Sequence, residues 1–341
     1  MHIHIVSWNL HGVPILAPRR QARMKLAALR LQSMRPAPDV IVLQEVFLPA
    51  DLDILKASIG DDYVTVDNIP QREYPPWFLP LLNLAGIFMR FRKSGLVAFV
   101  HRRWEVIADR FDEFHVQDLE VKFWEGDGYA DKGMQRIDLR HRQSGNQLTV
   151  FNTHTQSLRR QQDIRKAQIS QLAAAAYAVD REIPVLIAGD LNVRPEEPLY
   201  RIMTRDFRWR DMTKSVPTCG ERFGYVEDPA EKIARRRDYV FALANAHWRF
   251  KGSAQFICNL AEDVPYSDHH GLDAQIEIAP RFDAENGHAR LSLPSRLPLA
   301  ILALQTLRGP STRRAWLLAL GAALSFLWRS PDAQLKAEQE P

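Results

Sequence analysis

The chain has 341 residues, of which 46% are hydrophobic and 25% are charged. This balance is that of an ordinary globular protein and excludes wholesale disorder. The formal net charge of +4 and the sequence pI near 9.1 suit an anionic partner, such as a phosphate ester, a nucleic acid or an acidic membrane surface. Cys219 and Cys258 are too few for a disulfide framework, and their spacing offers no zinc pattern.

Short strand-like runs alternate with helical patterns from the N-terminus onward. Ile3 to Ser7 alternates as a strand, Arg20 to Met34 has a helical pattern, and Val40 to Leu43 is a buried strand that ends at Gln44-Glu45. Alternation of this kind predicts an α/β fold. Since no charged segment followed by a long apolar run opens the chain, we expect no cleavable signal peptide and a cytoplasmic or membrane-peripheral location.

The alternation continues to about residue 280. A long helix is expected over Gln161 to Asp180, where alanines raise the helix propensity. The further strands that we expect are Gly95 to Val100, Gln135 to Arg140, Leu148 to Asn152, Val185 to Ala188, Tyr239 to Leu243 and Leu272 to Ile278. These patterns predict one catalytic domain over residues 1–280, followed by a linker and a hydrophobic tail over residues 281–341.

Two apolar segments break the pattern and suggest contact with a membrane surface. Tyr74 to Lys93 carries several aromatic and aliphatic side chains and ends in cations, as an interfacial segment does, although folding onto its own core is the alternative. In the tail, Leu297 to Leu307 and Ala315 to Trp328 are each shorter than the roughly 20 residues that span a bilayer. They are expected to lie in the membrane interface or to pack on the catalytic domain.

Polar residues follow several of the expected strands, where a rigid sheet can direct them into one site. Glu45 and Asn9 offer oxygen atoms of the kind that Mg²⁺ prefers, and hydrolysis of a phosphodiester needs a metal to offset charge on the phosphoryl oxygens. Asp268-His269 offers a base and a carboxylate that could orient it.

A second set of polar residues could hydrogen-bond the phosphate, the water or the leaving oxygen. It consists of His154, Asp190 and Asn192. The motifs Trp-Asn, Gln-Glu, Asn-Thr-His, Gly-Asp-Leu-Asn and Ser-Asp-His, in this order, resemble those of the endonuclease/exonuclease/phosphatase superfamily over about residues 3 to 278. The resemblance implies a four-layer α-β-β-α sandwich, in which two packed mixed sheets are flanked by helices and the active site lies at one edge.

The resemblance also implies roles for the metal-binding and basic residues. Glu45 would be the principal ligand of Mg²⁺, with Asn9 nearby and Mn²⁺ as the alternative ion. His269 would be the general base, with Asp268 as its partner. Asp238, in a motif similar to the Arg-x-Asp-Tyr-Val strand of the family, would steady the site from behind.

The remaining roles concern the phosphate. Asp190 and Asn192 would position water and phosphate, and His154 would stabilise the phosphoryl transition state. Asp131-Lys132-Gly133 resembles the Asp-Lys-Gly loop of the neutral sphingomyelinase branch, which would bring Lys132 to the phosphate and let Asp131 control the loop. The alternative is a simple turn, since Asp and Gly are favoured turn formers.

The sequence therefore predicts an Mg²⁺-dependent phosphodiester hydrolase, similar to sphingomyelinases, that acts on a phospholipid. A nuclease acting on DNA or RNA is the alternative, with Arg159-Arg160 and Arg235 to Arg237 as groove cations, although the apolar Tyr74 to Lys93 argues against it. A non-catalytic lipid- or protein-binding module is a second alternative, and the presence of every expected catalytic group argues against that reading.

Overall fold

The computed structural model describes residues 1–13, 17, 19–67, 94–118, 130–214, 216, 236–245, 247–257, 260–261 and 264–281. The chain divides after Ala289 into two units, and all of the described residues lie in the first, Met1–Ala289. The segment from Tyr74 to Lys93 and residues 282–341 of the expected tail lie outside the described residues, so both membrane-contact hypotheses stay predictions. In the part that is described, no helix is long and apolar enough to cross a membrane.

One mixed sheet contains the N-terminal strand near its centre. Its described strands follow the order β11-β14-β1-β2-β4-β3. They are β1 (His2–Asn9), β2 (Val40–Gln44), β3 (Tyr63–Val66), β4 (Val97–His101), β11 (Trp248–Ile257) and β14 (Gly271–Pro280). Strands β1 and β2 are parallel, and the other neighbouring pairs are antiparallel.

A second mixed sheet packs against the first. Its described strands follow the order β5-β6-β7-β8-β10-β9, with β7 and β8 parallel. They are β5 (Trp104–Glu113), β6 (Gly133–His141), β7 (Gln147–His154), β8 (Val185–Asp190), β9 (Trp209–Asp211) and β10 (Asp238–Leu243). A short antiparallel pair, β12 (Leu260–Ala261) and β13 (Val264–Pro265), precedes β14.

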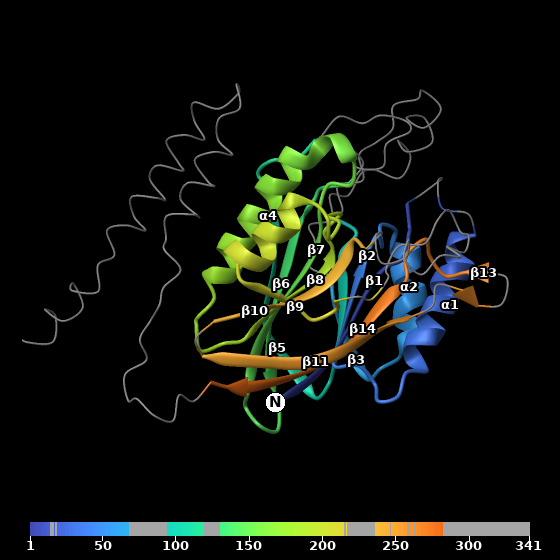
Figure 1. Cartoon of the computed structure of the whole chain (residues 1–341). Helices are drawn as coiled ribbons and strands as arrows, with labels where there is room; N and C mark the ends of the chain where they lie inside the picture. Colours follow the sequence, from blue (N-terminus) through green and yellow to red (C-terminus); the bar gives the residue numbers. More distant parts are fainter. Residues whose placement is uncertain are drawn as a thin grey trace, which may run out of the picture. The chain divides into compact units, whose positions relative to one another are not determined.

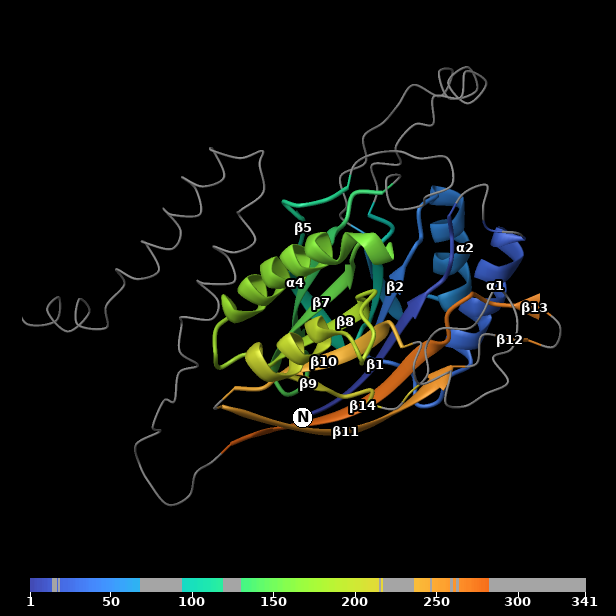
Figure 2. The same cartoon turned by 45° about the horizontal axis from the view of Figure 1, so that its top comes forward.

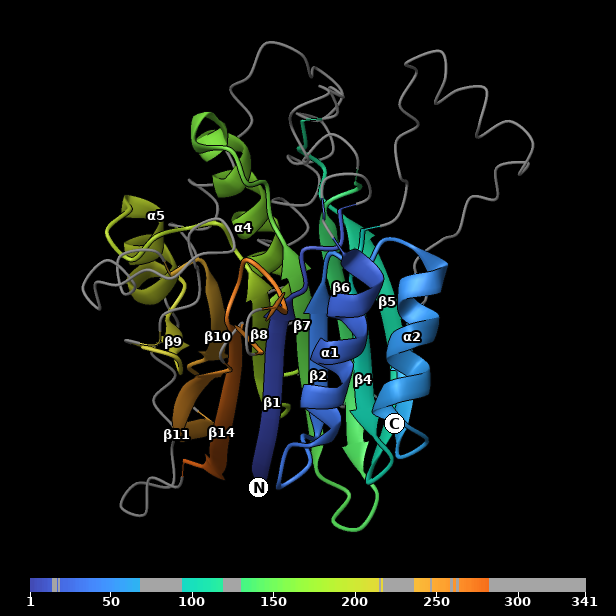
Figure 3. The ribbon, with the colours of Figure 1, turned by 90° about the vertical axis from the view of Figure 1, so that its right-hand side faces the viewer.

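Helices cover the outer faces of both sheets. Helices α1 (Arg20–Gln32) and α2 (Pro49–Ile59) lie over the first sheet, and Figure 3 shows them in front of the region of β2 and β4, with β1 beside α1. On the other side, Figures 1 and 2 show α4 (Gln162–Tyr177) over the second sheet. Short helical turns are η2 (Arg159–Gln161), α5 (Pro198–Arg201) and the π-helical η3 (Ile202–Asp206). The four-layer α-β-β-α sandwich predicted from the sequence is confirmed.

The burial of β1 shows how the layers form. Ile3 and Ile5 point into the core between the two sheets, whereas Val6 and Trp8 belong to the core beneath α1 and α2. Because this strand is covered on both faces, nearly all of its side chains are buried. The same double coverage explains the nearly continuous apolar run Val40–Gln44 of β2.

The strand register brings the polar strand ends to one edge of the sandwich. In the first sheet, Asn9 at the end of β1 lies beside Gln44 at the end of β2. In the second sheet, Asp190 at the end of β8 lies between His154 of β7 and Asp238 of β10. The carboxyl ends of two parallel pairs, one in each sheet, therefore meet at the same edge.

Candidate active site

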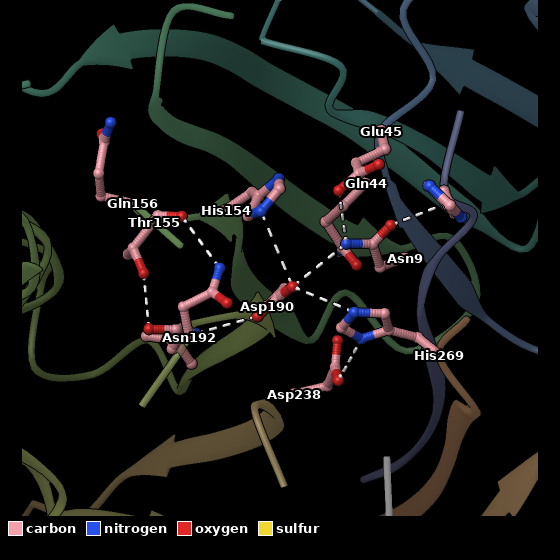
Figure 4. A network of polar contacts seen from close by, with 12 residues as sticks. Asn9, Gln44, Glu45, His154, Thr155, Gln156, Asp190, Asn192, Asp238 and His269 are labelled. Atoms are coloured by element: carbon pink, nitrogen blue, oxygen red, sulfur yellow. Dashed lines mark hydrogen bonds and ion pairs between the residues drawn. The ribbon is translucent and has the colours of Figure 1, made fainter. Parts of the chain in front are cut away.

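Asp190 lies at the centre of a polar cluster to which both sheets contribute (Figure 4). Its Oδ2 accepts a hydrogen bond of 3.1 Å from the Asn9 side-chain amide. The same oxygen lies 3.7 Å from Nε2 of His154 and 3.8 Å from Nε2 of His269. Burial alone would raise the pKa of Asp190, but the two histidines and other donors outweigh it and lower that pKa. Asp190 is therefore a buried carboxylate that stays ionised.

His269 is oriented by Asp238. Its Nδ1 lies 2.8 Å from Oδ2 of Asp238, and since an ionised carboxylate only accepts, Nδ1 carries the proton. Nε2, the acceptor nitrogen, consequently faces Asp190. The backbone of His269 is fixed as well, because its carbonyl accepts from the Trp8 indole at 2.9 Å and its amide donates to Ser267.

Asp268 was the expected partner of His269, and that expectation is wrong. The Asp268 carboxylate contacts the Ser267 hydroxyl at 3.3 Å and Nδ1 of His11 at 3.5 Å. Asp268 lies in a bend before β14, in which the Ser267 hydroxyl accepts from the His269 amide, and its carboxylate is directed to His11 rather than to the His269 ring. Asp238, expected behind the site, takes the place of Asp268 from a different strand.

His154 has a basic neighbour, Lys132, in addition to Asp190. The ammonium of Lys132 lies 3.1 Å from its Nε2, and because a lysine only donates, this nitrogen of His154 is the acceptor. Burial, reinforced by the Lys132 charge, lowers the pKa of His154 to about 3. Lys132 itself is 3% exposed, while Asp131 is half-buried beside it. The Asp-Lys-Gly tripeptide thus delivers a lysine side chain into the site.

Glu45 follows β2 in a left-handed backbone conformation, with φ of 62°. Its Oε1 accepts a hydrogen bond of 3.1 Å from Asn9, whereas Oε2 is buried and has no hydrogen-bond partner among the residues that the structure describes. Burial, and then the negative charge of Asp268, raise the pKa of Glu45 to about 7. A buried carboxylate oxygen with no donor is costly unless a cation binds it, so this oxygen fits a metal ligand.

Asn192 is held at the far side of Asp190 by a tight turn. It adopts a φ of 50°, its amide nitrogen donates to Oδ1 of Asp190 at 2.9 Å, and its side chain donates to the Thr155 carbonyl at 3.2 Å. Gly189, which precedes Asp190, has a φ of 144° and passes so close to β7 that a Cβ would lie 2.0 Å from the Thr153 carbonyl. Only glycine permits this approach, which sets Asp190 beside His154.

Two groups of described residues could hold a metal ion. Ligand atoms of Asp190, Asp238 and His269 lie within 4.8 Å of one another, but Nδ1 of this histidine is already bonded to Asp238. The pair Glu45 and Asn9 offers oxygen ligands and an unbonded carboxylate oxygen. Mg²⁺ prefers oxygen ligands, so the second group suits it better.

Sequence reasoning assigned no role to the buried amides that support the site. The Gln44 side chain donates to Oδ1 of Asn152 at 2.9 Å, and Asn152 donates in turn to Oε1 of Gln135 at 3.1 Å. This chain of amides joins β2 to β7 and β6, and therefore one sheet to the other. The signal available in the sequence was that Gln44 and Asn152 belong to the Gln-Glu and Asn-Thr-His motifs. Their hydrogen-bond partners come from strands far apart in the sequence, so the motifs alone do not show them.

Comparisons with known proteins agree with this geometry. The model of the Endonuclease/Exonuclease/phosphatase family matches residues 6–269. A curated relative, the inositol phosphosphingolipids phospholipase C of Schizosaccharomyces pombe, is 23% identical over 315 residues, which cover 81% of this chain and 68% of the relative.

Solved structures share the fold at low identity. The endonuclease/exonuclease/phosphatase from Bacteroides vulgatus has a TM-score of 0.60 and 15% identity, covering 82% of this chain and 100% of that one. TDP2 of D. rerio, complexed with a single-strand DNA product, has a TM-score of 0.58 and 16% identity, covering 81% and 99%. Since the family model spans most of the chain and ends on His269, the chain belongs to the Endonuclease/Exonuclease/phosphatase family, whose enzymes hydrolyse phosphodiester bonds.

Proposed function

We propose that this phosphodiesterase acts on a phospholipid, in the manner of a sphingomyelinase. The observation that carries the proposal is the contact of 3.1 Å between Lys132 and His154, because it brings the lysine of the sphingomyelinase-like Asp-Lys-Gly loop into the site. The relative that is named for an action on phosphosphingolipids supports the same substrate class. The shared chemistry is a phosphodiester that joins a lipid alcohol to a polar headgroup.

His269 serves as the general base. Its Nδ1 proton is held by Asp238, so Nε2 can take a proton from water, and the resulting hydroxide attacks phosphorus in line with the leaving alcohol. The ring becomes an imidazolium, which the Asp238 carboxylate stabilises at 2.8 Å. The proton is then available to the departing alkoxide or to solvent, which returns the ring to its starting state.

The opposite side of the site holds the phosphoryl oxygens. The Lys132 ammonium supplies a positive charge in a buried place, where it acts more strongly than in water. His154 stays neutral because its pKa is about 3, so its ring offers a hydrogen bond without repelling the lysine. Asn192, fixed by its turn next to Asp190, is placed to contact phosphate or the attacking water.

A divalent metal belongs to the chemistry of this family, and we propose that Glu45 holds Mg²⁺ with Asn9 beside it. Mn²⁺ is the alternative ion. When bound, the ion neutralises charge that develops on the phosphoryl oxygens and the leaving oxygen. The buried and unbonded Oε2 of Glu45 supports this assignment.

The location of the substrate completes the proposal. A lipid phosphodiester lies at a bilayer surface, so the enzyme would work at the membrane periphery from the cytoplasm. Tyr74 to Lys93 and the tail from residue 281 are the segments that we propose to contact the surface, on the strength of their apolar residues and flanking cations.

The test compares lipid and nucleic acid in parallel. Liposomes that contain sphingomyelin or an inositol phosphosphingolipid, plasmid DNA and RNA are each incubated with wild type and with His269→Ala, with and without Mg²⁺. We expect headgroup phosphate to be released from a liposome by wild type with Mg²⁺, and by neither the variant nor the metal-free enzyme. Cleavage of nucleic acid without lipid turnover would favour the nuclease alternative, and no turnover of any substrate would favour a binding module.

A further inference from the structure

A layer of glutamine side chains holds the segment that follows β5. Residues 114–118 form no strand or helix, so their backbone groups need other partners. Most of the partners described for Glu113–Asp118 are side-chain amides from elsewhere in the chain. The glutamine layer consists of Gln117, Gln156, Gln161, Gln168 and Gln171.

Helix α4 supplies two of these amides. Gln171 accepts from the amide of His115 and donates to the carbonyl of Glu113, both at 2.9 Å. Gln168 donates to the carbonyl of Val116 at 3.0 Å. Residues three apart on a helix share a face, so one face of α4 takes the place of a neighbouring strand.

Gln156 connects this layer to the active-site strand. It follows His154 by two residues and is fully buried together with Gln168. The two side chains bond each other at 3.2 Å, and the backbone amide of Gln156 also donates to Gln168 at 2.9 Å. Gln156 reaches the carbonyl of Asp118 at 3.4 Å. The end of β7, helix α4 and the segment after β5 are therefore joined through one pair of amides.

Gln117 carries the connection to Lys132. Its Oε1 accepts from the backbone amide of Lys132 at 2.8 Å, and its Nε2 donates to the carbonyl of Phe114 at 2.9 Å. The backbone amide of Phe114 donates in turn to the carbonyl of Lys132 at 2.9 Å. Both backbone groups of Lys132 are thus bound to the glutamine-held segment, while its ammonium contacts His154.

A buried lysine acts on a phosphate only if its main chain is fixed, because its side chain has four rotatable bonds. We infer that Gln117 is a positioning residue for the reaction: by bonding the Lys132 backbone, it keeps the lysine ammonium at His154 and the phosphoryl group. This inference rests on the proposed role of Lys132 at the phosphate. Within the glutamine layer it assigns Gln117 a function in the reaction, through the backbone of Lys132.

A double-mutant cycle separates positioning from general stability. Turnover of bis(4-nitrophenyl) phosphate with Mg²⁺ is measured for wild type, Gln117→Ala, Lys132→Ala and the double variant. A misplaced reacting group costs on the order of 10- to 100-fold, so Gln117→Ala should lower kcat/KM by about that factor. In the Lys132→Ala background the same change should cost less than about twofold, because residues that act through one contact are not additive. Equal losses in both backgrounds overturn the inference.

Two further variants serve as matched controls. Gln117→Glu keeps the acceptor oxygen for the Lys132 amide but loses the donor to the Phe114 carbonyl, so it should recover part of the rate lost in Gln117→Ala. Gln171→Ala removes two hydrogen bonds at the other end of the same segment, where no bond to Lys132 is involved, and should stay within about threefold of wild type. A loss in Gln171→Ala as large as that in Gln117→Ala would show a structural effect of the whole layer.

Hydrogen exchange gives a readout that needs no turnover. The Lys132 amide should be protected in wild type and should exchange at least tenfold faster in Gln117→Ala, with an unchanged far-UV spectrum. Unchanged exchange overturns the inference, even if no phosphodiester is cleaved. Failure of lipid hydrolysis alone refutes the proposed substrate, whereas the bis(4-nitrophenyl) phosphate cycle and the exchange rates still decide the role of Gln117.

Discussion

The two histidines of the site lie at almost the same distance from Asp190, yet their surroundings differ. Nε2 of His154 is 3.7 Å and Nε2 of His269 is 3.8 Å from the same carboxylate oxygen. His154 meets the ammonium of Lys132, whereas His269 meets the carboxylate of Asp238. A cation beside a ring disfavours its protonation, and an anion favours it.

The charged neighbour of each histidine therefore indicates which chemical role that histidine is suited to. His269 has a neighbour that stabilises a positive ring, as a base requires after it accepts a proton. Burial keeps the His154 ring neutral and the Lys132 charge reinforces that effect, as a hydrogen-bonding group beside a phosphate requires. In the proposed mechanism, the two sides of Asp190 therefore separate proton transfer from charge stabilisation, although the sequence shows each histidine only as a polar residue among the strand ends.

Removal of the His269 ring is expected to cause the largest loss of turnover. His269→Ala should lower kcat on bis(4-nitrophenyl) phosphate by about 10²- to 10⁴-fold, since that is what general base catalysis contributes. His2→Ala, at an exposed position in β1, is the control and should match wild type. A His269→Ala enzyme with near-wild-type turnover and an unchanged fold would remove the base from the proposed mechanism.

Substitution of Asp238 and of Asp268 tests which carboxylate orients His269. Asp238→Asn should reduce kcat by about 10²-fold or more, because an amide can hold the ring in the wrong tautomer. Asp268→Asn should cost far less, since its carboxylate contacts His11 and Ser267. The two variants are compared in the same steady-state assay. The reverse ranking would restore the pairing that sequence adjacency suggested.

The next prediction concerns Glu45, the proposed ligand of Mg²⁺. Glu45→Gln should raise the Mg²⁺ concentration for half-maximal activity by at least about 10- to 100-fold, the loss typical of an outer contact to a metal. Isothermal titration of Mg²⁺ into the metal-free protein provides the direct measurement. An unchanged affinity would move the ion to Asp190, Asp238 and His269, the other group of ligand atoms.

Glu45 should also give the metal-free protein an unusual stability profile. Its pKa is raised in the fold from 4.5 to about 7, so the folded state binds more protons than the unfolded state between these values. The contribution of Glu45 to the free energy of unfolding should therefore fall as the pH rises from about 4.5 to about 7. Urea denaturation of wild type and Glu45→Gln at several pH values isolates this contribution, because the difference between the two proteins should change over this window, and added Mg²⁺ should reduce that change.

The sequence predicted the central strands well and the edge strands poorly. The runs Val40–Gln44 and Val185–Asp190 are buried on both faces, so their apolar residues are nearly continuous. Strands β5 and β11 lie at sheet edges and mix exposed with half-buried residues, which hides their period. Helix α2 was also missed, because it begins at Pro49 just after a site loop.

In the site, order along the chain predicted which residues gather and failed to predict which pairs touch. Glu45, Asp190 and His269 all reach the same edge, as strand ends of a sandwich do. The pairing of His269 with Asp238 joins the segment before β14 in the first sheet to the start of β10 in the second, and no local pattern encodes this contact. The contact of Lys132 with His154 likewise depends on the pairing of β6 with β7.

The smallest expected effect concerns the protonation of the His154 ring, which should stay neutral. With a pKa of about 3, its ring should show no change in NMR chemical shift between pH 5 and 9. Lys132→Met should raise this pKa, although not to 6.5, because burial is the larger cause of the shift and remains. A titration of His154 in wild type near pH 6.5 would mean that the two histidines are not distinguished by their neighbours.

The same pKa fixes the sign of a stability effect at low pH. Between about pH 6.5 and about 3 the unfolded state binds a proton at His154 that the folded state does not. The contribution of His154 to the free energy of unfolding therefore falls as the pH falls through this window, by at most about 1.4 kcal/mol per pH unit. His154→Gln should weaken this dependence in urea denaturation, because it removes the buried ring that resists protonation.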